Sequence, residues 1–173
     1  MSKNKTKNLL TLNSTAIDKS LYLSLVHAYA KELAKIEHNM PGNEFELNVM
    51  YISFLNTDNI ECRKLINSDN DFVGFVLLEN LKADSTAPFD CFIMESYVAP
   101  KSRKQGLLKN EVEKYIADNS IKSFGYVVLK HNHNADEYWK KFFSENGFEI
   151  ERCDKLFPSK FKGCKCYIAR KIH

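Results

Sequence analysis

Apolar residues recur at helical spacing near the start of the chain. Between residues 16 and 38 they are separated by three, one, three, four and three positions, at Tyr22, Leu25, Val26, Tyr29, Leu33 and Ile36. This spacing places them on one face of a helix. Pro41 and Gly42 interrupt the pattern, and the apolar residues between 45 and 55 predict a second, shorter helix.

The middle of the chain has the pattern of strands. Residues 61–66 and 72–78 are rich in β-branched and aromatic side chains, and they flank a polar turn at 67–71. This arrangement predicts a hairpin. Residues 91–98 form a mostly apolar run whose length suits a central strand that ends before Pro100.

Helical and strand patterns alternate in the second half. A helix is predicted from Leu108 to about Asn119, a strand over 124–130, and a helix from Ala135 that Asn146 and Gly147 end. Two closing strands follow, at 148–150 and 166–170. The order predicts one α/β domain over residues 1–173, with a mixed central sheet flanked by helices and a flexible basic tail at 1–8.

Composition narrows the class of protein. The 173 residues carry 25 basic and 22 acidic side chains, a balance that does not indicate a nucleic-acid partner. The chain shows neither a signal-peptide pattern nor an apolar run that could span a membrane, so we expect a cytoplasmic protein without membrane contact. Five cysteines without a Cys-Xaa-Xaa-Cys pair predict reduced thiols.

A basic turn separates the central strand from the next helix. Residues 99–110 read AlaProLysSerArgLysGlnGlyLeuLeuLysAsn, with Arg103 and Gly106 three positions apart. The N-terminus of a helix exposes unpaired N–H groups, and a glycine lets a phosphate approach them. The turn is therefore a candidate phosphate site, although a solvated connection would have the same composition.

Two stretches resemble motifs of one family. Residues 98–108 are similar to the coenzyme A loop of the GNAT superfamily of N-acetyltransferases, in which Arg103 and Gly106 match and Leu108 replaces the usual Gly or Ala. Residues 135–149 resemble the helix that ends in an aromatic residue, here Phe143, four positions before GlyPhe. With the ValGlyPhe of residues 73–75, the resemblance covers roughly residues 9–171.

The resemblance implies the GNAT fold, with acetyl-CoA as the acetyl donor. It implies coenzyme contacts at the end of the central strand, along the basic turn and in the later helix. The residues concerned are Tyr97, Val98, Arg103, Lys104, Gln105, Gly106, Leu107, Leu108, Asn134 and Phe143. Asn134 would either meet the pantetheine amides or cap the helix that follows it.

The chemistry needs a base for the amine and an acid for the leaving thiolate. Glu95 is the one carboxylate within the central strand and shares a face with Tyr97, so it is the candidate base, or else a carboxylate satisfied by its neighbours. Phe143 has no proton to donate, which makes Tyr138 the candidate acid, or else a core aromatic residue. His131 and His133 lack a third ligand, and we predict no metal site.

The acceptor is left open by the sequence. Residues 30–37 are similar to the first-helix segment of polyamine acetyltransferases, and Glu37, Glu44 and Glu46 could attract a cationic amine. A small, polyamine-like amine is favoured. A protein lysine or N-terminal acetyltransferase and a non-catalytic acyl-CoA binding module are the alternatives, and the protein could be a monomer or a homodimer.

Overall fold

The computed structural model describes residues 17–36, 44–158, 161 and 163–172. The expected tail at 1–8, the apolar residues from Leu9 to Leu12 and the break at 39–43 lie outside these residues. The elements are α1 (Lys19–Ile36), α2 (Glu44–Phe54), β1 (Ile60–Ile66), β2 (Phe72–Asn80), β3 (Cys91–Val98), η1 (Pro100–Ser102), α3 (Leu107–Asn119), β4 (Ser123–Val128), α4 (His133–Glu145), β5 (Phe148–Arg152), η2 (Asp154–Leu156) and β6 (Lys165–Lys171).

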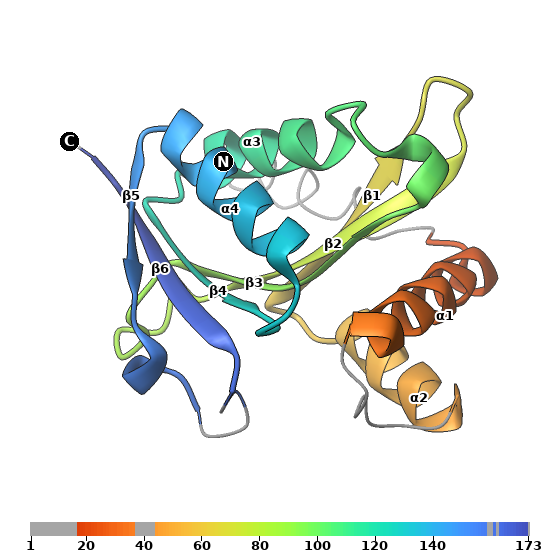
Figure 1. Cartoon of the computed structure of the whole chain (residues 1–173), viewed down its shortest axis with the longest axis horizontal. Coiled ribbons are helices and arrows are strands. Elements are labelled where there is room, and N and C mark those ends of the chain that lie inside the picture. The colour runs from red at the N-terminus through yellow and green to blue at the C-terminus, as the bar shows by residue number, and fades with distance from the viewer. Residues whose placement is uncertain (1–16, 37–43, 159–160, 162, 173) are drawn as a thin grey trace, which may run out of the picture.

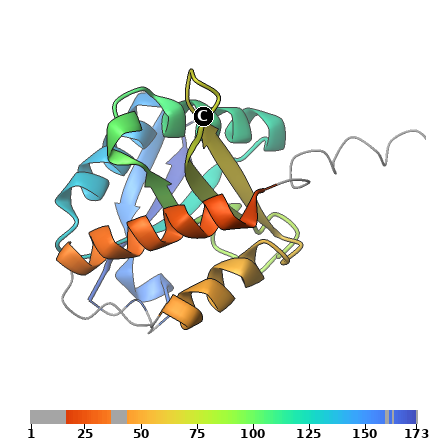
Figure 2. The same ribbon diagram turned by 90° about the vertical axis from the view of Figure 1, so that its right-hand side faces the viewer.

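Six strands form one mixed sheet in the order β1-β2-β3-β4-β6-β5, in which β3 and β4 are parallel and the other neighbours antiparallel. Helices α3 and α4 cover one face, and α1 and α2 cover the other (Figure 1). Figure 2 shows α1 crossing the sheet with α2 beneath it. The predicted mixed sheet, hairpin and central strand are confirmed, and no described helix is both long and apolar enough to cross a membrane.

Each face of the sheet has its own core. On one side Leu108, Val112 and Tyr115 of α3 pack with the aromatic residues of α4 against alternate residues of the strands. On the other side Tyr22 and Tyr51, from α1 and α2, pack on Phe75 and Tyr97. The alternation of strand side chains therefore determines which helix pair each residue meets.

The side chains of Asp18 and Asn132 cap the N-termini of two helices. The N–H groups of Ser20 and Leu21 donate to Asp18 Oδ1 at 2.9 and 3.1 Å, which starts α1. At α4 the Asn132 side chain accepts from the Ala135 N–H at 3.2 Å. The interpretation of Asn134 as the cap is therefore wrong, because an Asn two residues earlier takes that position and Asn134 lies exposed in the first turn.

The parallel strands β3 and β4 separate along their length. They pair at only three positions, of which the last joins Ile93 to Tyr126. On its other side β3 stays paired with β2 up to Val98, except at Met94, which the register skips. Such a bulge bends a strand and re-aims its side chains. A gap therefore opens beside residues 94–98 of β3.

Gly74 allows β2 to approach β3 at the end of this gap. A Cβ atom at Gly74 would lie 2.3 Å from the carbonyl oxygen of Tyr97, a backbone atom that no rotamer change can move. We expect Gly74→Ala to lower the free energy of unfolding by about 2–3 kcal/mol, as overpacking does. Urea denaturation measures this loss, and an unchanged midpoint would contradict the close approach.

Candidate active site

The end of β3 directs main-chain groups into the gap. The Ala99 N–H donates to the Val73 carbonyl at 2.8 Å. In an antiparallel pair this bond means that the N–H and C=O of Val98, opposite Gly74, point away from β2. Ser96, two residues earlier, has the same orientation. Both residues therefore present main-chain groups toward the side on which β4 has separated.

Arg103 connects the gap to helix α1. Its Nε donates to the Val98 carbonyl at 2.9 Å, and its terminal nitrogen donates to Glu32 at 2.6 Å. The guanidinium also lies 5.9 Å from the centre of the Tyr97 ring. In this conformation the Arg103 guanidinium joins the end of β3 to α1. The Val98 N–H is left as the donor that faces the gap.

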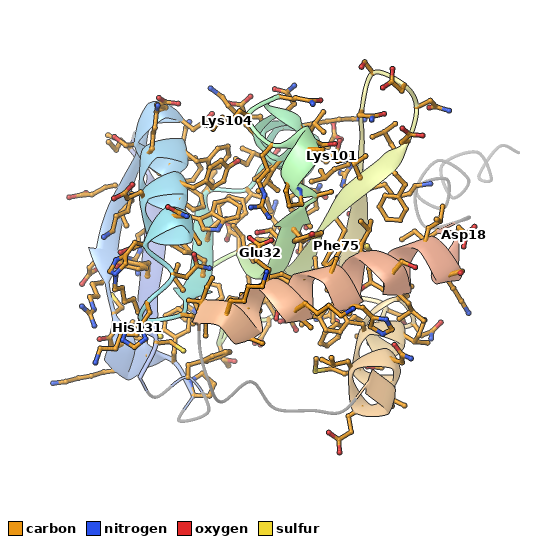
Figure 3. The ribbon with its side chains drawn as sticks, turned by 45° about the vertical axis from the view of Figure 1, so that its right-hand side comes forward. Asp18, Glu32, Phe75, Lys101, Lys104 and His131 are labelled. Atoms are coloured by element: carbon orange, nitrogen blue, oxygen red, sulfur yellow. The ribbon has the colours of Figure 1, made fainter. Side chains whose placement is uncertain are left out.

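The turn before α3 has the backbone conformation of an anion site. Lys104 and Gly106 both have positive φ, at 65° and 77°, and α3 begins directly afterwards. Such alternation points successive N–H groups into one concavity, and no side chain caps the first turn of α3. Among the described residues no carboxylate pairs with Lys101 or Lys104, which both extend from this turn (Figure 3).

Leu108 does not fill this concavity. Its side chain is 9% exposed and packs in the core beneath α3. The departure from Gly or Ala at this position is therefore accommodated on the side of the helix that faces the sheet. Gln105 is exposed and Leu107 half-buried at the start of α3. The structure brings the backbone of residues 103–108 together as one turn.

Phe143 lies on α4 and is not part of the turn before α3. It is fully buried and contacts the rings of Phe124, Tyr126 and Phe148. The expected coenzyme contact at Phe143 is therefore not available in this structure, because its ring lies between α4 and the sheet. Its function in the fold is packing.

Glu95 faces a group of tyrosines on the α1 side of the sheet. The Tyr29 hydroxyl donates to Glu95 Oε2 at 2.5 Å, and the Tyr29 ring centroid lies 5.6 Å from that of Tyr97. Glu95 and Tyr97 thus share a face, as the alternation predicts, and the bulge at Met94 accompanies this orientation. The carboxylate is partly buried between β3 and the two N-terminal helices.

Burial gives Glu95 a basicity suited to proton transfer. It raises the pKa of the Glu95 carboxyl to about 7, and hydrogen bonds from Tyr29 and Tyr51 restrain the rise. A general base functions best when its pKa lies near the working pH. Tyr29 and Tyr51 were visible in the sequence only as members of apolar helix faces, and nothing there indicated that their hydroxyl groups converge on Glu95.

Tyr138 lies on the opposite side of the sheet, on α4. Its ring stacks on Phe142 at a centroid distance of 6.4 Å, and 36% of its surface is exposed. Burial and the nearby charge of Glu113 raise its pKa, so the phenol keeps its proton at neutral pH. It is therefore partly exposed and does not contact Glu95.

These features fit an acyl-CoA thioester. The pantetheine amides need main-chain partners of the kind that Ser96 and Val98 present, and the pyrophosphate needs N–H groups and cations of the kind found at residues 101–108. Among the described residues, no three His, Cys, Asp or Glu side chains form a group that could hold a metal ion.

Comparisons with solved structures agree on the fold. An acetyltransferase from Thermus thermophilus is 17% identical, with a TM-score of 0.62, and the match covers 87% of this chain and 89% of that one. A spermidine N-acetyltransferase chimera based on Vibrio cholerae is 15% identical, with a TM-score of 0.60 and coverage of 90% and 92%.

A third neighbour is the diaminobutyrate acetyltransferase of Paenibacillus lautus, solved with L-2,4-diaminobutyric acid and coenzyme A. It is 13% identical, with a TM-score of 0.58 and coverage of 88% and 89%. No known family profile matches the sequence, and no curated protein matches it. The separated strands, the turn before α3 and these neighbours together show that the chain has the acyl-CoA N-acyltransferase fold of the GNAT superfamily.

Proposed function

We propose that this protein transfers an acetyl group from acetyl-CoA to the primary amine of a small molecule. The observation that carries the proposal is the position of Glu95. A carboxyl with a pKa raised to about 7 lies on the strand whose main-chain groups face an open gap. A turn with the geometry of a phosphate site follows that strand after the short helix η1.

Coenzyme binding would use the backbone more than the side chains. The N–H groups of residues 104–108 would hold the pyrophosphate, with Lys101 and Lys104 adding positive charge. Ser96 and Val98 would pair with the pantetheine amides as an additional strand would. The Val98 N–H would then donate to the thioester carbonyl, where such a donor stabilises developing negative charge.

In the transfer step Glu95 would accept one proton and Tyr138 would donate another. The amine nitrogen attacks the thioester carbonyl carbon, the new C–N bond forms and the C–S bond breaks. Glu95 takes the proton that the amine loses, directly or through a water molecule. The thiolate leaves and receives a proton, for which Tyr138 is the candidate donor because its phenol is protonated at neutral pH.

Replacing Tyr138 with Phe tests whether Tyr138 protonates the leaving thiolate. The change removes only the hydroxyl, so the stacking on Phe142 and the fold should persist. We expect kcat to fall by about 10²-fold, the lower range for loss of a general acid, while the Kd for acetyl-CoA stays unchanged. Unchanged kcat would remove Tyr138 from the mechanism and leave the proposal for Glu95 intact.

Three observations bear on the acceptor. Tyrosines of α1 and α2 surround Glu95, which favours a small amine over a protein surface. Two fold neighbours carry the names of spermidine and diaminobutyrate acetyltransferases. Of the acidic residues expected to attract a polyamine, Glu37 and the Glu44 side chain lie outside the described residues, while Glu46 is exposed on α2.

The test is amine-dependent release of the coenzyme A thiol from acetyl-CoA. A mixture of small diamines and amino acids should give thiol release and an acetylated product that mass spectrometry identifies by its mass. Release with a lysine peptide and with no small amine would favour the protein acetyltransferase. Binding of acetyl-CoA without release for any amine would favour the non-catalytic module.

A further inference from the structure

Two tyrosine hydroxyls from different helices meet at the carboxylate of Glu95. Tyr29 of α1 donates to Glu95 Oε2 at 2.5 Å, and Tyr51 of α2 donates to the same carboxyl. Glu95 itself lies on β3, so three elements that are separate in the chain supply one hydrogen-bonded group. Two donors restrict the directions in which a carboxylate can lie, provided that the rings carrying them are themselves held in place.

Packing around Phe75 of β2 holds both rings. Phe75 is completely buried, and its ring centroid lies 6.2 Å from that of Tyr29 and 6.3 Å from that of Tyr51. In Figure 3 Phe75 lies between the sheet and α1. The Tyr29 ring also packs on Tyr97, at a centroid distance of 5.6 Å. Neither hydroxyl can therefore turn away from Glu95 without disturbing this core.

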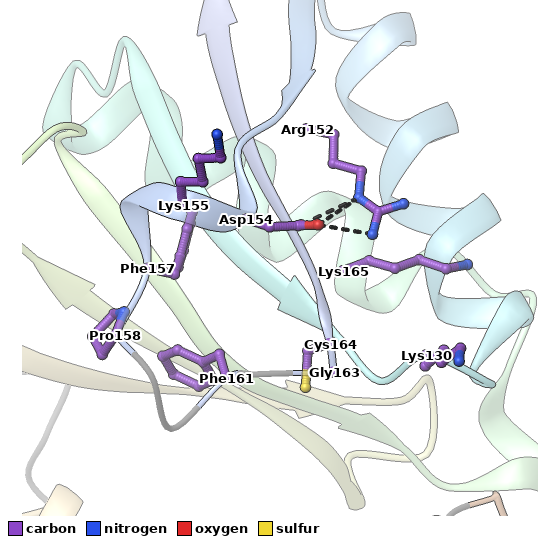
Figure 4. A pocket seen from close by; sticks show the side chains of 10 residues that line it. All are labelled: Lys130, Arg152, Asp154, Lys155, Phe157, Pro158, Phe161, Gly163, Cys164 and Lys165. Carbon is purple, nitrogen blue, oxygen red and sulfur yellow. Dashed lines mark hydrogen bonds and ion pairs between the residues drawn. The ribbon is translucent and has the colours of Figure 1, made fainter.

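The donors to Glu95 are neutral, unlike the donor to a carboxylate elsewhere in the molecule. Asp154 lines a cavity of about 540 Å³ between the β5–β6 connection and the end of β4, where Arg152 binds it at 2.8 and 3.0 Å (Figure 4). Hydrogen bonds from the Arg152 guanidinium hold the pKa of Asp154 below its ordinary value. Tyrosine hydroxyls offset only part of the rise that burial causes at Glu95. Neutral donors thus fix the Glu95 carboxylate and leave it able to accept a proton near neutral pH.

Other titratable or charged groups share this side of the sheet with Glu95. Burial raises the pKa of the phenols and the thiol among them, which stay protonated at neutral pH: Tyr22, Tyr29, Tyr51, Cys62 and Tyr97. Glu32 and Arg103 bond each other at 2.6 Å, and His27 joins α1 to α2 through a 2.7 Å hydrogen bond. Lys64 faces this side from β1. A buried carboxyl that titrates near neutral pH in this core is therefore Glu95.

We infer that Tyr29 and Tyr51 are positioning residues of the reaction, which together orient the Glu95 carboxylate and keep it ionised for the incoming amine. Helices α1 and α2 thereby contribute to proton transfer in addition to covering the sheet. This inference rests on the proposed function for the role of Glu95 as the base. Loss of either hydroxyl leaves the carboxylate with one donor fewer, so that its ionised form becomes less favourable.

The test measures the pKa of Glu95 directly, from the ¹³C chemical shift of its side-chain carboxyl, with Glu95→Gln identifying the signal. Tyr29→Phe and Tyr51→Phe each remove one hydroxyl and keep the ring. Each should raise the pKa of Glu95 by about one pH unit, the contribution of one hydrogen bond to a charged group. Tyr22→Phe is the matched control and should leave this pKa unchanged. The Tyr22 hydroxyl lies in the same core and has no hydrogen-bond partner among the described residues.

The pH profile of thiol release should move in the same direction. With one small amine and saturating acetyl-CoA, Tyr29→Phe should be about fivefold slower than the wild type at pH 7, because a smaller fraction of Glu95 is ionised there. The difference should shrink as the pH rises above about 9, where the carboxyl of both proteins is ionised. A purely structural role for Tyr29 would lower the rate by the same factor at every pH.

An unchanged pKa of Glu95 in both Tyr29→Phe and Tyr51→Phe would overturn the inference, as would an equal rise in Tyr22→Phe. The carboxyl titration needs no substrate, so these outcomes are distinct from failure of the proposed function. Thiol release with an unchanged pKa contradicts the inference alone. A raised pKa in the two variants, without thiol release for any amine, supports the role of the hydroxyls at Glu95 and contradicts the acetyltransferase.

Discussion

Glu95→Gln is expected to lower kcat for acetyl transfer by roughly 10²- to 10⁴-fold, the usual contribution of a general base. The amide keeps an oxygen that can accept from Tyr29, so the hydrogen bond of the wild type survives. What it loses is the capacity to take a proton. Steady-state thiol release at saturating amine and acetyl-CoA measures the change.

The acetyl-transfer rate of the same variant should no longer rise with pH near neutrality. Because burial raises the pKa of Glu95 to about 7, the wild-type rate should rise with pH through that value as the carboxyl ionises. Glu95→Gln should be flat over the same interval. A wild-type limb near neutrality that persists in the variant would assign the titration to another group.

The free energy of unfolding of Glu95→Gln is the control for its loss of activity. A raised pKa in the folded state means that ionised Glu95 lowers stability, progressively from about pH 4.5 to 7 and fully above. Glu95→Gln should therefore increase the free energy of unfolding at pH 8, by roughly 3 kcal/mol at about 1.4 kcal/mol per pKa unit. Lower stability in the variant would mean that lost activity reflects misfolding.

Gly106→Trp is expected to weaken acetyl-CoA binding by more than about 100-fold, because two or more charge-assisted hydrogen bonds to the pyrophosphate would be lost. Gly106 has φ of 77°, and among nearby atoms a Cβ there would meet only the Asn110 side chain, at 3.8 Å. The indole would thus extend over the exposed N–H groups of the turn. Isothermal calorimetry measures the change in Kd.

The matched control is Gly106→Asn. Asn tolerates a positive φ better than other non-glycine residues, and its side chain is short. It should retain more of the affinity than Trp, and both variants should unfold at similar urea concentrations. Equal acetyl-CoA affinity in the wild type and Gly106→Trp would show that the coenzyme does not bind at this turn.

The elements were predictable because their patterns are local. The spacing of Tyr22, Val26 and Leu33 alone defines the buried face of α1, and the apolar run of residues 91–98 marks β3 as a central strand. The cap of α4 was misplaced at Asn134 because two candidate Asn residues lie two positions apart. Backbone conformation decides between them, and the sequence does not specify it.

The site was predictable only in part, because its properties depend on contacts between distant residues. The alternation of β3 placed Glu95 and Tyr97 on one face, as found. The bonds from Arg103 to Val98 and Glu32 join elements far apart in the chain. The burial of Phe143 depends on strands that pack against α4, so a motif position could not indicate it.

The central claim is that the gap beside β3 and the turn before α3 form one acetyl-CoA site. A calorimetric titration of the wild-type protein with acetyl-CoA tests it most directly. We predict binding of one molecule per chain with a Kd in the micromolar range. Absence of binding at millimolar acetyl-CoA would contradict the claim and leave the GNAT fold without its coenzyme function.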